Sequence, residues 1–294
     1  MSVEPLMAAA LRLSVSVDSL AALGAELQLR QEGQDGDPRV RALLQDVVRA
    51  TGPRLLEGLD DLQESSTLAL IRAIFRQAMD LLEDPAREVG WSYRDREILQ
   101  AQGQVSRLIV HGMGAMAAQR PELGSTLQQS GAFLDIGTGT GWLAIEAACS
   151  WPSLRVVGID PWEPALALAR RNIAQSGLAA RIEVRLQRVD ELDDRSTYSL
   201  AWLPGPFIDI GVAARALPRI QRALKPGGWL VFGLNAPVPG PLEEALASLR
   251  VVRWGGHAWT PQEVTERLSA FEFEDIETFS PGGPILFIVG RRGH

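Results

Sequence analysis

The stretch that most constrains this chain reads Phe-Leu-Asp-Ile-Gly-Thr-Gly-Thr-Gly-Trp at residues 133–142. An apolar run followed by three alternating glycines predicts a buried strand, a tight turn and the start of a helix. Glycine permits positive φ in such a turn and lets a ligand approach the bare backbone. Two acids accompany the turn. Asp135 precedes it, and Asp160 ends the next apolar run about 20 residues on, where a carboxylate can accept hydrogen bonds from ribose hydroxyls.

Two kinds of nucleoside ligand compete for this turn. A dinucleotide fingerprint reads G-x-G-x-x-G, so that backbone N–H groups meet a pyrophosphate at a helix N-terminus. This turn reads G-x-G-x-G and has Trp142 where the last glycine of that pattern belongs, which disfavours a nicotinamide oxidoreductase. Asp135 would repel a pyrophosphate and attract an ammonium group. A ligand with an ammonium group, a ribose and no phosphate fits S-adenosylmethionine.

The turn resembles the first motif of the class I S-adenosylmethionine-dependent methyltransferases, D/E-x-G-x-G-x-G, through Asp135 and the three glycines. Residues 220–230 resemble the family's Leu-Lys-Pro-Gly-Gly turn before its fifth strand, and residues 271–289 resemble its closing hairpin with an antiparallel seventh strand. The resemblance covers roughly residues 100 to 290. It implies an α/β fold with a doubly wound, mostly parallel, seven-stranded Rossmann-like sheet.

The apolar pattern after about residue 130 alternates between strand and helix, which predicts a parallel sheet covered on both faces. Ligands of such sheets bind beyond the carboxyl ends of the strands, so the glycine turn and both acids are expected to converge there. The expected strands are 132–136, 155–159, 181–186, 198–203, 228–234, 271–279 and 284–290, and the expected helices are 141–150, 162–176, 211–224, 240–249 and 260–269.

Residues 1 to about 120 show helical periodicity and no strand-like alternation. Apolar side chains from Leu68 to Leu82 recur at three- and four-residue steps, which indicates an amphipathic helix with Ser65 or Ser66 as its expected N-cap. We therefore expect an N-terminal all-helical cap or substrate domain at residues 1–120 and a cofactor-binding core at residues 121–294.

The resemblance also implies how the cofactor lies. Asp135 should sit near its ammonium group and Asp160 at its ribose hydroxyls, although Asp135 has the alternative of bonding the turn's own N–H groups and Asp160 that of capping its strand. Trp162 is expected either to stack on the adenine or to shield its own helix. Arg188 stands where the family usually has an acid, so the adenine contact departs from the family pattern. The expected cofactor residues are Asp135, Gly137, Thr138, Gly139, Gly141, Asp160, Pro161, Trp162, Arg188, Val189, Asp190 and Leu203.

The segment at residues 202–207, Trp-Leu-Pro-Gly-Pro-Phe, carries the substrate prediction. Family members that methylate the amino groups of adenine and glutamine have N/D-P-P-Y/F here, and this chain lacks that polar residue. The loop offers an apolar wall instead, with Trp202, Pro204 and Phe207 as expected contacts, which favours an apolar or aromatic small molecule. The alternative is a rigid turn that only shapes the cofactor pocket.

Three residues are candidates for catalytic roles. His257 follows the fifth expected strand and His111 lies before the glycine turn, and an unperturbed imidazole titrates near pH 6.5, which suits a general base. Tyr93 is a candidate to orient an acceptor. Each also has a purely structural alternative.

Charge and composition limit the partners. Lys and Arg number 29 against 36 Asp and Glu, a net charge of −7, which disfavours binding to nucleic acid. The single cysteine, Cys149, allows no intramolecular disulfide and fits a reducing cytosol. The N-terminus lacks the basic start of a signal peptide, and no apolar run of membrane-spanning length is expected. We therefore expect a cytoplasmic protein with no membrane partner and no metal, for which a homodimer stays possible.

The sequence predicts an enzyme that transfers a methyl group in line from S-adenosylmethionine to oxygen, nitrogen or carbon of a small or specialised metabolite in a closed pocket. S-adenosylhomocysteine is the expected product. A protein or peptide acceptor is the alternative within the same class. A non-catalytic scaffold or regulatory protein is the alternative outside it, because fold and site do not by themselves fix the chemistry.

Overall fold

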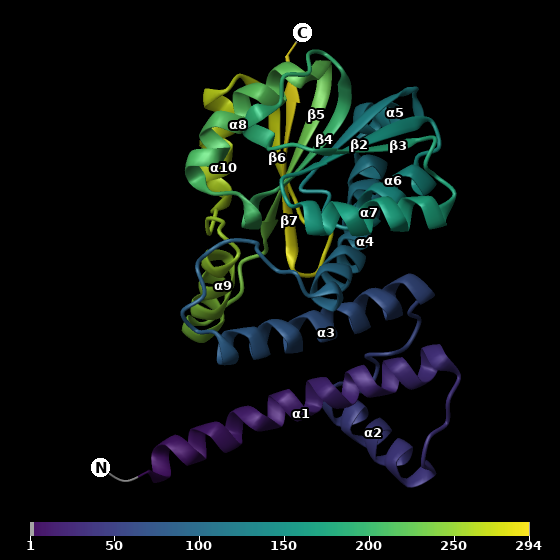
Figure 1. Ribbon diagram of the computed structural model, residues 1–294, viewed down its shortest axis with the longest axis vertical. Coiled ribbons are helices and arrows are strands. Elements are labelled where there is room, and N and C mark those ends of the chain that lie inside the picture. Colours follow the sequence, from purple (N-terminus) through teal and green to yellow (C-terminus); the bar gives the residue numbers. More distant parts are fainter. Residues whose placement is uncertain (1–2, 294) are drawn as a thin grey trace. The chain divides into compact units, whose positions relative to one another are not determined.

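The computed structural model describes residues 3–293, and the chain divides into two compact units at Pro85. The N-terminal unit is helical: α1 (Glu4–Glu32), α2 (Pro38–Thr51) and α3 (Asp61–Glu83) pack together around Leu27, Leu68 and Ile71 (Figure 1). Gly24 lets α1 and α3 approach closely, because a Cβ there would lie 3.0 Å from Ile71 Cγ2.

Helix α3 begins earlier than expected. Asp60 accepts a hydrogen bond from the Gln63 N–H, and the Gln63 side chain accepts one from the Asp60 N–H, which together form a capping box. The expected N-cap at Ser65 or Ser66 is therefore wrong, since both residues lie inside the helix.

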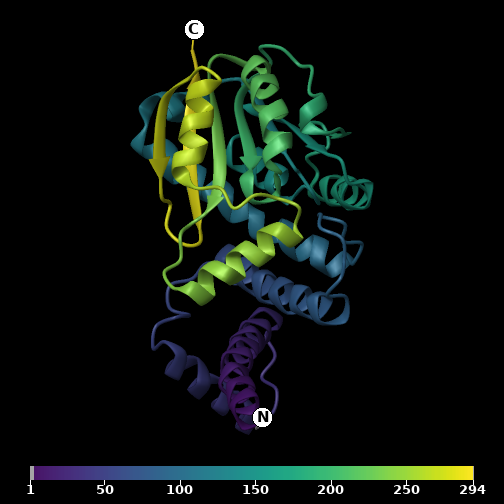
Figure 2. The ribbon, with the colours of Figure 1, turned by 90° about the vertical axis from the view of Figure 1, so that its left-hand side faces the viewer.

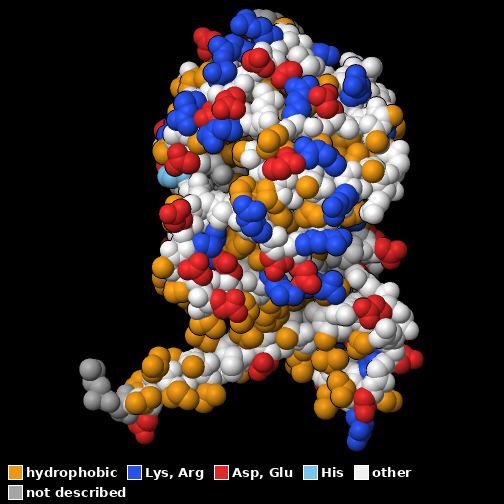
Figure 3. All heavy atoms as spheres, viewed as in Figure 1, with side chains coloured by type: hydrophobic (Ala, Val, Ile, Leu, Met, Phe, Trp, Pro, Cys, Tyr) orange, Lys and Arg blue, Asp and Glu red, His pale blue; other side chains and the backbone are white. Residues whose placement is uncertain are grey.

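Helix α1 contradicts a second expectation from the sequence. By length and composition it is long and apolar enough to cross a membrane, with a mean hydropathy of 1.5 in its most apolar window, so the prediction that no run of this length exists is wrong. One such helix near an N-terminus is weak evidence for a membrane span, since signal sequences and the core helices of soluble proteins pass the same test. Its first half exposes a series of apolar side chains (Figure 3), which are Leu6, Met7, Leu11, Leu13, Val15 and Val17.

Residues 86–293 form three layers, in which one sheet lies between two layers of helices (Figure 2). Its described strands lie in the order β3-β2-β1-β4-β5-β7-β6, and all are parallel except β7, which runs antiparallel to both neighbours. The predicted seven-stranded doubly wound sheet with an antiparallel seventh strand is confirmed. The bounds are β1 (Gly131–Ile136), β2 (Leu154–Asp160), β3 (Ile182–Leu186), β4 (Tyr198–Pro204), β5 (Leu224–Asn235), β6 (Phe273–Phe279) and β7 (Ile285–Arg292).

Helices cover both faces of the sheet because each presents an apolar stripe to it. One face carries α4 (Arg96–Gln119), α5 (Pro121–Gln128), α6 (Trp142–Ser150) and α7 (Glu163–Ser176), and the other carries α8 (Ile210–Ala223) and α10 (Pro261–Ala270). Between β5 and α10 the chain forms α9 (Pro241–Arg253).

Several boundaries differ from those expected, among them the following two. Strand β5 starts at Leu224 rather than at residue 228, because the Pro-Gly-Gly turn is inserted as a bulge between the pairs Tyr198–Leu224 and Leu200–Trp229. The compact units separate at Pro85 rather than at about residue 120. Helix α4 belongs to the core unit because Met113 and Met116 are buried within the sheet's own apolar cluster.

Candidate cofactor and acceptor site

The glycine turn between β1 and α6 has a backbone that only glycine adopts readily. Gly137, Gly139 and Gly141 have φ of 70°, 55° and 79°. The N–H groups of Gly137 and Thr138 donate to Ile159 O at 2.8 and 3.1 Å, which ties the turn to β2. A Cβ on Gly139 would have its nearest neighbour, Gly137 O, 3.8 Å away. The backbone at Gly139 is thus open to a ligand.

Asp160 at the end of β2 bridges the turn and helix α7. Its Oδ2 accepts from the Gly139 N–H at 2.9 Å and its Oδ1 from the Trp162 N–H at 2.8 Å. Burial raises the pKa of Asp160 to about 6 against the opposing effect of these two bonds. A carboxylate offers about four lone pairs, so the group caps its strand and retains acceptor capacity for hydroxyls.

Asp135 lies deeper, 1% exposed, and its Oδ2 accepts a hydrogen bond from Thr138 Oγ1 at 2.7 Å. Burial raises the pKa of Asp135 to about 7, the Thr138 bond opposes the rise, and the charge of Asp160 adds to it. A cation placed near these two carboxyl groups would favour their ionised forms. In its ionised form, the pair would suit an ammonium group.

A hydrogen-bonded clamp holds the far side of the turn. Trp142 Nε1 donates to Gln100 Oε1 at 2.6 Å, Gln100 Nε2 donates to Asn172 Oδ1 at 3.1 Å, and Asn172 Nδ2 donates to Thr140 O at 2.8 Å. Gly103, one turn after Gln100 on α4, leaves room for the loop, because a Cβ there would lie 2.0 Å from Thr140 Oγ1. Helices α4, α6 and α7 thus fix the turn together.

The sequence analysis missed Gln100 and Asn172. Their roles depend on side chains of three separate helices meeting, which no local pattern reports. The available signal was Trp142 itself, because a large indole in place of a glycine needs a partner for its N–H when it is partly buried.

The expected adenine side is occupied by an ion-pair cluster. Asp190 accepts from Arg188 at 2.9 and 3.2 Å and from Arg215 of α8 at 3.0 and 2.9 Å. Burial would raise the pKa of Asp190, but the bonds from both arginines outweigh it and lower the pKa. Val189 beside them is buried. The Arg188 guanidinium is therefore paired with the Asp190 carboxylate.

Trp162 is joined to the segment before α4. Its indole Nε1 donates to Tyr93 O at 2.8 Å, and the Arg94 guanidinium lies 5.2 Å from its ring centroid. Pro161 before it is exposed. Adenine stacking on Trp162 stays a prediction, and the indole demonstrably anchors residues 93–94 over the end of β2.

Aromatic rings gather where β4 and α9 end; we call Trp91, Tyr93, Phe207 and Trp254 the aromatic cluster. Phe207 stacks on Trp254 with ring centroids 4.8 Å apart, and the Trp91 ring stands edge-on to both, 5.0 Å from Phe207 and 6.2 Å from Trp254. Tyr93 lies 5.0 Å from Trp91. Of these, the sequence predicted Phe207 and Tyr93 as site residues and missed the two tryptophans.

Glycine contacts hold these segments together. A Cβ on Gly255 would lie 2.8 Å from the Cα of Gly90, and one on Gly256 would lie 1.9 Å from Pro206 O. The Gly90 N–H also donates to Arg253 O at 3.0 Å. Three chain segments far apart in sequence thus meet backbone to backbone beneath the aromatic cluster.

Two further expected acceptor residues, Trp202 and Pro204, and the expected cofactor residue Leu203 belong to β4. Pro204 ends β4 against the glycine turn, with its Cγ 3.1 Å from the Cβ position of Gly137. Leu203 and Trp202 are buried in the apolar core, and the Trp202 ring packs edge-on to Phe287 at 5.8 Å. Their contacts with ligands stay predictions.

The three catalytic candidates have different surroundings. His257 lies in the loop after α9, with its Nε2 3.5 Å from Glu263 Oε1 and its ring edge-on to Trp259. His111 on α4 lies 3.0 Å from Glu146 of α6, with a half-exposed side chain. Tyr93 is buried, and its hydroxyl accepts a hydrogen bond from Arg87 at 3.1 Å. His257 lies on the same loop as Trp254, whereas His111 lies on α4.

The described residues contain no group of three or more His, Cys, Asp or Glu side chains placed to hold a metal ion.

Comparison with known families agrees with this geometry. Residues 133–228 match the model of a methyltransferase domain, and this span runs from β1 through the glycine turn to the Pro-Gly-Gly turn of β5. This part of the core is therefore similar to methyltransferase domains.

Curated relatives align with about one third to one half of this chain. A ribosomal protein L11 methyltransferase of Sorangium cellulosum is 29% identical over 142 residues, which is 47% of this chain and 42% of that protein. A demethylmenaquinone methyltransferase of Thermus thermophilus is 36% identical over 115 residues, which is 36% of this chain and 47% of that protein. The chain therefore spans less than two thirds of the length of these relatives.

Solved structures resemble the chain over its whole length. An O-methyltransferase family protein from Burkholderia thailandensis has a TM-score of 0.65 at 16% identity, covering 100% of this chain and 98% of that chain. Human N-acetylserotonin methyltransferase has a TM-score of 0.63 at 16% identity, covering 100% and 99%. At these identities the likeness establishes the fold, including a helical N-terminal region.

The two buried acids predict a pH dependence of stability. An unfolded aspartate titrates near pH 3.9, so between that pH and about 7 the folded chain binds more protons at Asp135 and Asp160 than the unfolded chain does. The free energy of unfolding should therefore fall as the pH rises from about 4 to about 7. One pKa unit corresponds to about 1.4 kcal/mol, so the fall should be on the order of a few kcal/mol.

Asp135→Asn should remove part of this loss while still accepting the Thr138 bond. The test is urea unfolding of both proteins, ligand-free, at about pH 4 and about pH 7, and the difference between the proteins isolates Asp135 from carboxylates with lowered pKa values such as Asp190. An equal pH dependence in both proteins would contradict the prediction.

The clamp predicts that Gln100→Ala loosens the glycine turn. Trp142 Nε1 and Asn172 lose a partner, so the free energy of unfolding should fall by about 1–3 kcal/mol and the affinity for S-adenosylhomocysteine should drop several-fold. Calorimetric titration and urea unfolding measure both effects. Gln102→Ala, on the same helix, is the matched control and should change neither, and equal behaviour of the two variants would refute the clamp.

Proposed function

We propose that the chain is an S-adenosylmethionine-dependent methyltransferase that methylates a small apolar or aromatic molecule. The observation that carries the proposal is the open backbone of Gly139 beside the buried carboxyl groups of Asp135 and Asp160, in a core that is similar to methyltransferase domains.

The residues at this site fit the cofactor on their own chemistry. The ligand must approach an uncovered main chain, which Gly139 offers, and it must bring a positive charge to two buried acids. Asp160 would bind ribose hydroxyls and Asp135 would face the ammonium group, directly or through water. A pyrophosphate placed there would meet two carboxylates, which disfavours a dinucleotide.

The bound cofactor supplies a methyl group activated on a sulfonium sulfur. The chain contributes position and exclusion of water: the clamp and Asp160 fix the turn, and Pro204 packs against it. Well-oriented reactants can reach effective molarities of about 10⁵–10⁸ M. Charge disperses during transfer, so a dry, apolar surrounding favours the reaction.

The aromatic cluster supports an apolar or aromatic acceptor. The rings of Phe207, Trp91 and Trp254 are half-buried and lie near the end of β4. The end of β4 lacks the Asn or Asp that would bind an amino group. The helical N-terminal unit is shared with solved O-methyltransferases, which supports a small-molecule acceptor over a protein one. The apolar substrate contacts proposed from this chain are Trp202, Pro204 and Phe207, to which we add Trp91 and Trp254.

His257 is the favoured general base among the three candidates. The Glu263 carboxylate lies 3.5 Å from its Nε2 and can orient the ring. A base of this kind contributes roughly 10²–10⁴-fold. His111 and Tyr93 remain proposals of lower rank, because His257 shares its loop with Trp254 of the aromatic cluster, His111 lies on α4, and the Tyr93 hydroxyl accepts a hydrogen bond from Arg87.

Substitution at Gly139 tests the function. Gly139→Ala places a methyl group where only a ligand would meet it, so it should lower the affinity for S-adenosylhomocysteine at least tenfold and abolish transfer of a labelled methyl group to phenolic test acceptors. Gly114→Ala is the control, since a Cβ there also meets nothing and its φ is ordinary.

Two results would contradict the proposal. One is binding of S-adenosylhomocysteine by Gly139→Ala with wild-type affinity. The other is tight binding of NADH in place of S-adenosylhomocysteine by the wild-type chain.

We also propose a cytoplasmic homodimer that pairs through α1. Between residues 5 and 25 the charged residues are Arg12 and Asp18, so an antiparallel pair centred on Val15 brings Arg12 of each copy opposite Asp18 of the other. The exposed apolar side chains on the same face of α1 as Val15, which are Met7, Leu11 and Val15, would then be covered. The free Cys149 is compatible with a reducing compartment.

Val15→Cys in a Cys149→Ser background should form a disulfide-linked dimer on mild oxidation, because Val15 lies at the proposed two-fold axis and is exposed. Val40→Cys on α2, also exposed, is the control and should stay unlinked. Light scattering should give a dimer for the wild-type protein in detergent-free buffer. A monomer, or recovery only with membranes, would overturn this pairing.

A further inference from the structure

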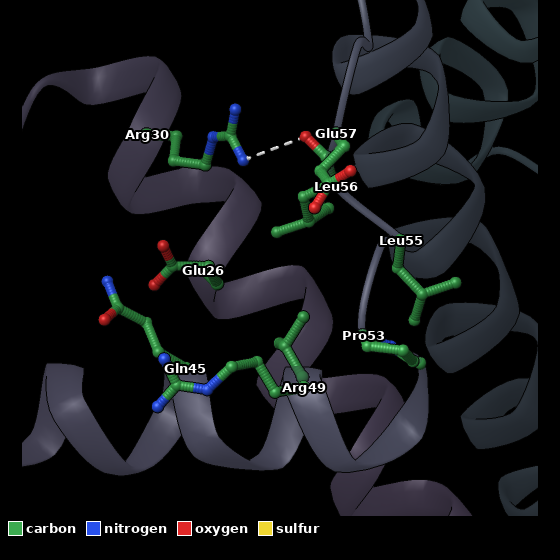
Figure 4. Close-up of a pocket in the computed structure, with 10 residues that line it drawn as sticks. Glu26, Arg30, Gln45, Arg49, Pro53, Leu55, Leu56 and Glu57 are labelled. Carbon is green, nitrogen blue, oxygen red and sulfur yellow. Dashed lines mark hydrogen bonds between the residues drawn. The ribbon is translucent and has the colours of Figure 1, made fainter.

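The N-terminal unit contains a pocket of about 250 Å³ between α1, α2 and the segment that follows α2 (Figure 4). Its lining is amphipathic: Glu26, Gln45 and Arg49 gather on one side, and Pro53, Leu55 and Leu56 on the other. All of these residues precede Pro85, whereas every expected cofactor residue lies in the core unit. The pocket is therefore formed by residues other than those of the proposed methyl-transfer site.

Glu26 of α1 is the unusual member of this lining. It is 5% exposed, and its Oε2 is buried without a hydrogen-bond partner. Its Oε1 forms an ion pair with Arg41 at 3.6 Å from Nη2, which is too long for a hydrogen bond, while Arg41 Nη1 donates to Gln34 O at 2.6 Å and to Asp35 at 3.3 Å. A buried carboxylate oxygen without a donor is costly, so Glu26 is poised to accept one.

Neither arginine of the lining supplies the missing hydrogen-bond donor to Glu26 Oε2. Arg30 pairs with Glu64 at 2.7 Å and donates to Leu56 O at 3.5 Å. Arg49 pairs with Asp46 on its own helix. The positive charges at the pocket are thus each matched by another acid, and Glu26 is the buried group with acceptor capacity to spare.

We propose that this pocket binds a small organic ammonium ion with an apolar body. The ammonium group would donate to the Glu26 carboxylate, which can turn about its terminal torsion to present either oxygen, and the Gln45 amide oxygen lies on the same side. The apolar body would lie against Leu55, Leu56 and Pro53. Pockets for drug-sized ligands measure roughly 300–1,000 Å³, so the ligand here is smaller.

Calorimetric titration of the full-length protein with 2-phenylethylammonium tests the site, and 2-phenylethanol is the neutral probe of matching shape. The ammonium compound should bind and the alcohol should bind at least tenfold more weakly. Glu26→Gln should lose at least tenfold in affinity for the ammonium compound. Glu57→Gln, at the exposed rim of the same pocket, is the matched control and should bind as the wild type does.

A second variant keeps the test decisive if Glu26→Gln folds poorly. Gln45→Lys places an ammonium group of the chain itself beside Glu26, so it should raise the melting temperature and abolish binding of 2-phenylethylammonium. The proposal is overturned if the alcohol binds as well as the ammonium compound, if Glu26→Gln folds and binds normally, or if Gln45→Lys leaves binding unchanged. Since no readout involves methyl transfer, these outcomes are independent of the proposed enzymatic function.

Discussion

The bonds that Asp160 accepts from the backbone are the interaction on which the cofactor site depends. One carboxylate joins the Gly139 N–H of the glycine turn to the Trp162 N–H at the start of α7, so the ends of β1 and β2 are held in one arrangement. This requires a bare, left-handed backbone at three alternate positions, which explains the glycines. The clamp of Gln100, Trp142 and Asn172 secures the same turn from the opposite side.

That arrangement places two carboxyl groups in a buried region where both resist ionisation. A cation beside these two carboxyl groups would favour their ionised forms. In the N-terminal unit, the carboxyl group of Glu26 is also buried, and its Oε2 has no hydrogen-bond partner.

Much of the core was readable from the sequence, because its strands are near-continuous apolar runs punctuated by glycine and proline. The β1 run, the glycine turn and Asp160 lie within 30 residues of one another, so local pattern suffices for them. The N-cap of α3 was misplaced because the periodic apolar face starts after the capping box at Asp60. The membrane-length apolar character of α1 was missed because isolated charges such as Arg12 interrupt it.

Trp91 and Trp254 could not be predicted, because they meet Phe207 only in three dimensions. The three rings come from distant segments, and their spacing in sequence carries no periodic signal. The backbone contacts of Gly255 with Gly90 and of Gly256 with Pro206 make these segments one mechanical unit. In the proposed acceptor site, the preference for an acceptor is consequently a shared property of three loops, and a change of substrate by mutation would have to remodel them together.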